Sequence, residues 1–205
     1  MITRPVYTLL ATFALGACAH TSAAPPSATV TETSAMTSSS PSVPATENVT
    51  ADDLLSRVLE VIEGSRTLSD LTPEYLSATM GQAVHTVKND PRRYRAFGPL
   101  TREWSYGFGV DETQLDGRWF EFRFDPTAAG ASPPMSEICR LDFDGFTRQL
   151  EQMGFVRERN VAEHGRWMSD FFTRPGMRVE VFPRGEAGAS SEHVAHKCVE
   201  WVYIR

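Results

Sequence analysis

Histidine and cysteine side chains near the end of this chain have a spacing that could bind a metal ion. The segment reads His193-x-x-His196-x-Cys198, and Cys139 could supply a fourth ligand. Imidazole nitrogen and thiolate sulfur are the donors that zinc prefers in a tetrahedral site. Such a site needs both cysteines reduced, so its assignment depends on the compartment in which the protein works.

Glu163, His164 and Asp170 could supply parts of a hydrolytic site. A histidine base needs a nucleophile to activate, and the sequence contains no Gly-x-Ser-x-Gly motif that would present one. The residues Glu163-His164-Gly165 also fall between two expected strands, where a turn favours glycine and polar residues. We therefore interpret this segment as a turn.

Two pairs of acidic residues have the residue types that glycoside hydrolysis requires. Asp111 and Glu112 fall in an expected hairpin loop, and Asp142 and Asp144 fall at the expected start of a helix, where acidic side chains stabilise the first turn. Turns and capping explain both pairs. The sequence thus predicts no catalytic residue and no cofactor, and we expect that the chain is not an enzyme.

A basic cluster at Arg92, Arg93 and Arg95 contrasts with the acidic balance of the chain, whose formal net charge is −6. Arginine has the planar, bidentate geometry that protein interfaces favour, so these residues are candidates for binding a partner, and a solvated loop is the alternative. Trp119 is the fourth candidate, because it alternates out of phase with the phenylalanines of its own expected strand. A covering helix is the alternative for Trp119.

The residues Leu15-Gly16-Ala17-Cys18 end a short apolar run that follows a single positive charge at Arg4. The run is too short to span a bilayer permanently, which takes about 20 apolar residues. A charged start, a short apolar core and small residues before the cleavage point are typical of an export signal. The stretch resembles the lipobox of bacterial lipoprotein precursors. This resemblance implies that residues 1–17 are removed as a signal peptide and that Cys18 is lipidated.

The lipoprotein resemblance also implies a location. A diacylglyceryl thioether together with a further acyl chain such as palmitate makes a stable anchor. In this class an aspartate after the modified cysteine tends to retain the protein at the inner membrane, whereas this chain has Ala19. We therefore expect a lipid anchor in the bacterial outer membrane, with the protein facing the periplasm.

Lipidation of Cys18 would leave Cys139 and Cys198 as a pair in an oxidising compartment. We predict a disulfide between them and no metal site, so His193 and His196 become ordinary residues of a polar loop. Loss of residues 1–17 would remove Arg4 and no acidic residue, which leaves a net charge of −7. This balance argues against nucleic acid as a partner.

The chain divides into a spacer and one folded domain. Residues 18–48 are rich in Ser, Thr, Ala and Pro, and they cannot bury enough apolar surface to fold, so we expect a lipidated, disordered tether. Residues 49–205 form the expected domain, in which capping and periodicity predict helices between residues 50 and 64, 72 and 81, and 142 and 154. No internal repeat is visible in the sequence.

Alternating apolar residues predict the strands that follow these helices. They fall near residues 104–109, 119–124, 155–159, 167–173, 177–182 and 198–204. The resulting fold class is α+β, an antiparallel sheet of about five to six strands with helices packed on one face. A Cys139–Cys198 bond would join the third helix to the last strand.

These features favour a membrane-anchored periplasmic lipoprotein that acts as a protein-binding module. Its anchor, spacer and lack of a catalytic set loosely resemble immunity and inhibitor lipoproteins, which act against envelope-targeting toxins or lytic enzymes. An envelope assembly or maintenance lipoprotein is one alternative. A hydrolase with an unrecognised site is another.

Overall fold

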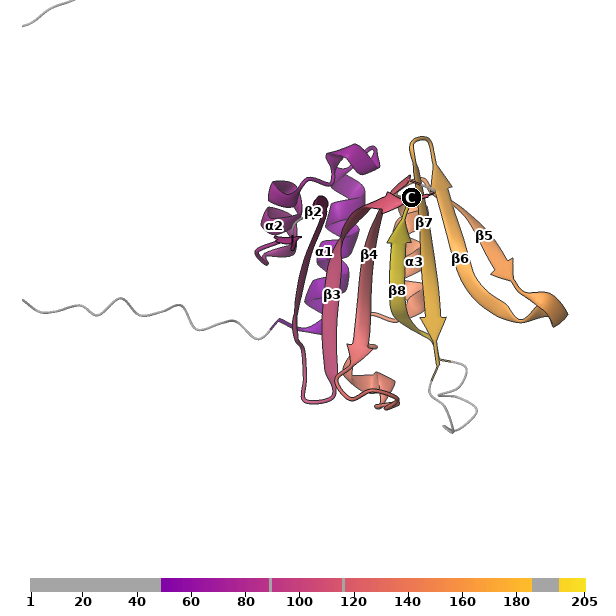
Figure 1. Cartoon of the computed structure of the whole chain (residues 1–205). Helices are drawn as coiled ribbons and strands as arrows, with labels where there is room; N and C mark the ends of the chain where they lie inside the picture. Colours follow the sequence, from indigo (N-terminus) through magenta and orange to yellow (C-terminus); the bar gives the residue numbers. More distant parts are fainter. Residues whose placement is uncertain (1–48, 89, 116, 186–195) are drawn as a thin grey trace, which may run out of the picture. The chain divides into compact units, whose positions relative to one another are not determined.

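Eight antiparallel strands form one continuous sheet, and the helices pack on one of its faces (Figure 1). In this computed structural model the described residues are 49–88, 90–115, 117–185 and 196–205. The strands are β1 (His85–Val87), β2 (Asp90–Pro99), β3 (Trp104–Gln114), β4 (Gly117–Pro126), β5 (Val156–Val161), β6 (Trp167–Arg174), β7 (Met177–Arg184) and β8 (Cys198–Ile204). The helices are α1 (Ala51–Gly64), α2 (Pro73–Met80) and α3 (Phe143–Gln152), with short 3-10 turns η1 (Leu68–Asp70), η2 (Met135–Glu137) and η3 (Glu163–Gly165).

Several predictions concern residues outside these ranges. The signal peptide at residues 1–17, the lipidation of Cys18, the tether at residues 18–48 and the position of His193 all lie outside the described part of the chain. Within the described part, no helix has both the length and the apolar character needed to cross a bilayer.

The predicted count of five to six strands is wrong, because the sheet has eight strands. The omitted strands are β1 and β2, and β2 contains the arginines for which a solvated loop was the alternative to partner binding. Asp90, Pro91 and the arginines that follow are typical of a loop, yet Tyr94 and Ala96 are buried and place β2 in the core. The packing of helices against an antiparallel sheet is broadly consistent with the α+β class.

The helices begin where the sequence places capping residues. Thr50 and Asp53 form a capping box at the start of α1, in which the Asp53 amide donates to Thr50 Oγ1 at 3.2 Å and the Thr50 amide donates to Asp53 Oδ2 at 3.0 Å. Asp142 caps α3 by accepting a hydrogen bond of 2.7 Å from the Gly145 amide. The apolar faces of α1 and α3 are buried against the sheet in one core.

The domain contains two halves, each of which has a helix before four antiparallel strands. Helix α1 precedes strands β1 to β4, and helix α3 precedes strands β5 to β8. The spatial order β1-β2-β3-β4-β8-β7-β6-β5 joins the two halves through the β4–β8 pair. The sequence shows no repeat, so this symmetry exists only in the topology.

The two faces of the sheet have different surroundings. Side chains such as Phe108 on β3 and Phe122 on β4 face the helices and are buried. Their strand neighbours face the other way, and no helix in the described part of the chain covers that second face (Figure 1). We call it the open face.

Candidate functional site

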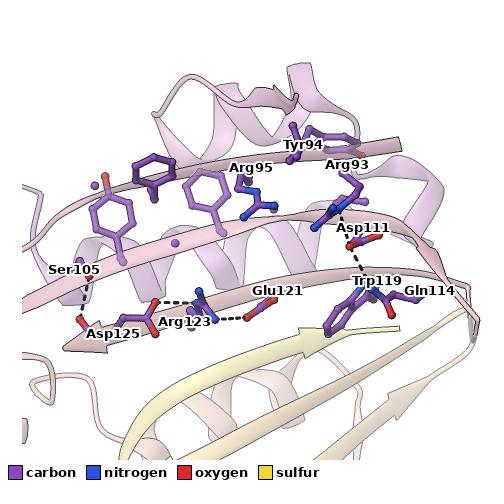
Figure 2. A pocket seen from close by; sticks show the side chains of 18 of the residues that line it. Arg93, Tyr94, Arg95, Ser105, Asp111, Gln114, Trp119, Glu121, Arg123 and Asp125 are labelled. Atoms are coloured by element: carbon purple, nitrogen blue, oxygen red, sulfur yellow. Dashed lines mark hydrogen bonds and ion pairs between the residues drawn. The ribbon is translucent and has the colours of Figure 1, made fainter. Parts of the chain in front are cut away.

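A groove of about 730 Å³ lies on the open face over β2, β3 and β4 (Figure 2). Its floor contains Gly107 and Gly109 of β3. Glycine has no side chain, so the floor is backbone at these two positions, whereas the paired positions on the neighbouring strands carry side chains. Phe97 of β2 pairs with Gly107 and is 79% exposed. The groove is therefore a shallow depression with a large apolar side chain at its edge.

Close packing of β3 against β2 explains why glycine is needed at one of the two positions, Gly109. A Cβ atom at Gly109 would clash with the Tyr94 carbonyl oxygen and would lie 2.8 Å from Arg95 Cβ. At Gly107 the nearest atom to an added Cβ would be 3.8 Å away, so a small side chain would fit there. Gly109 is required by the sheet itself, whereas Gly107 leaves open space above the floor.

Ion pairs within β4 and between β2 and β3 hold most of the charged side chains in the groove (Figure 2). Arg93 Nε lies 3.0 Å from Asp111 Oδ2, across the β2–β3 pair. Arg123 lies between two acids of its own strand, with contacts of 3.5 Å to Glu121 and 2.8 Å to Asp125. These pairs fix the guanidinium groups in place.

Burial on the open face shifts the pKa values of two side chains, Glu121 in the groove and Tyr203 beside it. Burial raises the pKa of Glu121, and the nearby Asp125 adds to this effect, while Arg123 and Arg95 oppose it. Burial and the charge of Glu121 raise the pKa of Tyr203 on β8 to about 12. Glu121 is thus a carboxylate that is costly to ionise inside the site.

Aromatic side chains continue the open face beyond the groove towards the second half of the sheet. Trp119 of β4 stacks on Tyr203 of β8, with ring centroids 4.9 Å apart and an angle of 9° between the rings. Trp201 and Phe182 follow, with centroid distances of 6.1 Å for Trp201–Tyr203 and 5.7 Å for Phe182–Tyr203. The groove therefore opens onto a rigid aromatic surface.

The structure brings together three of the four residues that the sequence singled out for binding a partner. Arg93, Arg95 and Trp119 all line the groove, and no helix of the described residues covers Trp119. Arg92 is not among the lining residues. Its side chain is 62% exposed and forms an ion pair of 3.1 Å with Asp90.

Sequence reasoning missed the residues that give the groove its shape. Phe97 lies in the omitted strand β2, and the role of Gly107 and Gly109 depends on which strands flank them. The available signal is the alternation of small residues with aromatic residues in residues 104–109, since Gly107 and Gly109 leave two positions on one face of the strand without side chains.

The predicted disulfide between Cys139 and Cys198 is confirmed, with a Cα–Cα distance of 5.0 Å and a sequence separation of 59 residues. It joins the segment before α3 to the first residue of β8. His196 lies beside it, with Nδ1 3.6 Å from Cys139 Sγ and Nε2 3.3 Å from Asp142 Oδ2. The other histidine of the predicted motif, His193, is outside the described residues.

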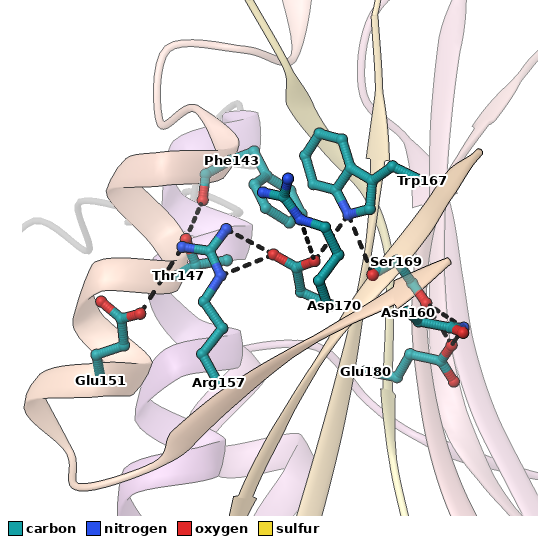
Figure 3. A network of polar contacts seen from close by, with 10 residues as sticks. Phe143, Thr147, Glu151, Arg157, Asn160, Trp167, Ser169, Asp170 and Glu180 are labelled. Atoms are coloured by element: carbon teal, nitrogen blue, oxygen red, sulfur yellow. Dashed lines mark hydrogen bonds and ion pairs between the residues drawn. The ribbon is translucent and has the colours of Figure 1, made fainter. Parts of the chain in front are cut away.

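Asp170 belongs to a buried polar network on the helix side of the sheet (Figure 3). Its carboxylate accepts hydrogen bonds of 2.7 Å from Arg157 Nε and 2.7 Å from Trp167 Nε1, and Arg159 lies 3.6 Å away. This network joins β5 to β6 and, through Arg157, reaches α3. His164 lies apart in η3, as the expected turn between two strands requires.

The paired carboxylates considered for glycoside hydrolysis have structural partners. Asp111 binds Arg93, and Glu112 binds Arg118 at 2.8 Å. Asp142 caps α3 in addition to contacting His196. Asp111 and Glu112 lie in β3 near its end, so the hairpin loop expected for them is wrong, whereas Asp142 caps α3 as expected.

No protein-family model, curated protein or solved structure matches this chain.

Proposed function

We propose that this chain is a lipoprotein, anchored in a bacterial outer membrane through Cys18, whose domain binds another protein through the groove on the open face. The observation that carries the proposal is the combination of an uncovered groove with an exposed aromatic side chain at its edge. Phe97 is 79% exposed although it lies in a regular strand beside the glycine floor. A large apolar side chain beside a depression is typical of an interaction surface.

The composition of the groove supports a protein partner. Interfaces between proteins are enriched in tryptophan, tyrosine and arginine, and these residue types line this face at Trp119, Tyr203, Arg93 and Arg95. The charges of the groove are mixed, which fits the polar rim of an interface better than a surface for nucleic acid.

The groove is also well ordered before any partner arrives. Its side chains stand on paired strands, and the ion pairs of Arg93 and Arg123 and the stacking of Trp119 restrict their motion. Binding to such a surface costs less conformational entropy than binding to a loop. A partner segment can therefore be recognised by shape.

The chemistry of the groove indicates what the partner presents. The space above Gly107 can receive an apolar side chain, which would also contact Phe97. Arg95 forms no ion pair with any described residue, so a carboxylate of the partner would find an available guanidinium there. We propose a partner loop with an apolar side chain next to an acidic one.

The specific form of the proposal is an inhibitor or immunity protein. In this form the partner is a toxin or lytic enzyme that reaches the envelope, and a tether keeps the domain where such an enzyme arrives. The preformed groove supports this form, because an inhibitor must bind tightly without first changing its shape.

The test uses the purified chain carrying Cys18→Ser as bait for envelope and secreted bacterial proteins. The double variant Phe97→Asp/Arg95→Glu changes the groove, and Arg148→Glu changes an exposed arginine on α3, on the helix side. We expect the unchanged chain and the Arg148→Glu variant to retain the same partner equally well. The groove variant should bind this partner at least about 30-fold more weakly.

Two results would count against the proposal. One is that no protein is enriched on the unchanged bait. The other is that every enriched protein binds the groove variant as tightly as the Arg148→Glu control.

A further inference from the structure

Cys139, Cys198 and His196 bring three metal-binding atoms within 4.8 Å of one another at the junction of α3 and β8. The two sulfurs are joined as a disulfide, and His196 Nδ1 lies 3.6 Å from Cys139 Sγ. The imidazole therefore faces the sulfur pair from a distance that allows all three atoms to share one ion.

Asp142 orients this imidazole. Its Oδ2 lies 3.3 Å from His196 Nε2, so the tautomer with its proton on Nε2 would donate to the carboxylate and present the Nδ1 lone pair to the sulfurs. A carboxylate bound to the second nitrogen of a ligating histidine is a recurrent feature of protein zinc sites. The same arrangement exists here beside two cysteines.

Backbone contacts hold the two cysteine segments together independently of the sulfur–sulfur bond. The Phe143 amide donates a hydrogen bond of 2.9 Å to the Lys197 carbonyl, and Asp142 pairs with Cys198 as an isolated β-bridge. Phe143 and Cys198 are also buried in the core. The thiols should thus remain neighbours after the disulfide is reduced.

We propose that the reduced chain binds one zinc-class divalent cation through the sulfurs of Cys139 and Cys198 and Nδ1 of His196. A dithiol reductant supplies two electrons and two protons, becomes a disulfide itself, and converts the protein disulfide to two thiols. The cation then replaces the two thiol protons, which pass to solvent. His196 is 51% exposed, so a water or a further donor can complete the tetrahedron.

This site is redox-gated, because the disulfide form has no thiolate to offer. It is separate from the groove on the open face, and its test does not depend on the proposed protein partner. Two thiolates and one imidazole favour zinc over hard cations such as magnesium and calcium.

The experiment uses the full chain with Cys18→Ser, so that the remaining thiols are those of the site. The chain is reduced with a dithiol, separated from it without air, and titrated with Co²⁺ as a spectroscopic probe. We expect one equivalent to bind with a thiolate-to-cobalt charge-transfer band, which Zn²⁺ then removes by displacement. The oxidised chain should show no such band.

Single substitutions define the ligands. Asp142→Asn keeps the helix cap and should weaken Co²⁺ binding about 10–100-fold, and His196→Ala should weaken it further. His85→Ala, a change to an exposed histidine of β1, is the matched control and should have no effect. The double variant Cys139→Ser/Cys198→Ser should lose the band.

The proposal is overturned if the reduced chain shows no charge-transfer band, if His196→Ala binds Co²⁺ as tightly as His85→Ala does, or if the oxidised chain binds equally. Far-ultraviolet circular dichroism is recorded in parallel. A reduced chain that loses its secondary structure and does not regain it with Co²⁺ also overturns the proposal, since the site requires an intact junction.

Discussion

Trp119 and Tyr203 stack face to face across the centre of the sheet, with 4.9 Å between their ring centroids. Trp119 belongs to β4 in the first half of the domain, and Tyr203 belongs to β8 in the second half. The contact therefore reinforces, on the open face, the one strand pair that connects the two halves of the sheet.

A double-mutant cycle on Trp119→Ala and Tyr203→Ala should report this stacking directly. We expect a coupling free energy of about 0.5–1.5 kcal/mol, because offset aromatic pairs contribute this much beyond the area they bury. The measurement is urea unfolding of the four proteins, followed by far-ultraviolet circular dichroism. Additive effects of the two single changes would mean that the rings stabilise the sheet separately.

Substitution of Asp170 should be among the most destabilising changes on the helix side. Asp170 is fully buried, and Asp170→Asn removes the buried charged partner of Arg157, which keeps only a contact of 3.7 Å to Glu151. We expect a loss of about 3–5 kcal/mol in the free energy of unfolding, because breaking a buried ion pair leaves an uncompensated charge. Asp144→Asn, a change at an exposed residue of α3, is the control. In chemical denaturation this variant should lose less than about 1 kcal/mol of its free energy of unfolding, as is usual for a surface substitution. Equal stability of the two variants would contradict this prediction.

Glu121 should make the stability of the domain depend on pH. Burial raises the pKa of Glu121 in the folded state, so its neutral form stabilises the fold at pH values below the ordinary glutamate pKa of about 4.3. That contribution is lost as pH rises through the raised pKa. The stability of the wild type relative to Glu121→Gln should therefore fall as pH increases through this window and then level off.

Urea unfolding of both proteins between about pH 4 and 8 measures the difference. Glu158→Gln, an exposed change on β5, is the comparison variant and should track the wild type across the window. A constant difference between the wild type and Glu121→Gln would show that Glu121 titrates alike in the folded and unfolded chains.

The proposed lipid anchor gives a prediction about Cys18. The wild-type chain should fractionate with membranes, and Cys18→Ser should move it to the soluble fraction, because the thioether that carries the acyl chains can no longer form. Mass spectrometry of the natural product should show an acylated Cys18 as its first residue. An unmodified Cys18, or one still preceded by residues 1–17, would contradict the lipoprotein assignment.

Local signals indicate the helices and the interior position of the last strand. Thr50 and Asp142 are the caps that the sequence indicates, and Gly81 ends α2 in the left-handed conformation that glycine adopts readily. Apolar residues on both sides of β8 are typical of an interior strand, and it lies between β4 and β7. These features depend on residues close together in the chain.

The groove depended on contacts that no local pattern specifies. Arg93 and Arg95 belong to a strand only because two other residues of β2 pack into the core formed by other elements. These residues are Tyr94, between the two arginines, and Ala96, after Arg95. The charges of this segment favoured a loop, and tertiary packing overrode that preference. The placement of Arg95 and Trp119 in one groove follows from strand order, which the sequence does not reveal.

The mirrored strand order has a consequence for how the domain is made. β8 is the last of the eight strands to leave the ribosome, and it occupies a central position between β4 and β7. Until it arrives, each half ends in an unsatisfied strand edge, which is a hazard for aggregation. Residues 198–204 therefore complete the sheet: a chain interrupted before them would leave the edges of β4 and β7 open and would have no strand pair between its halves.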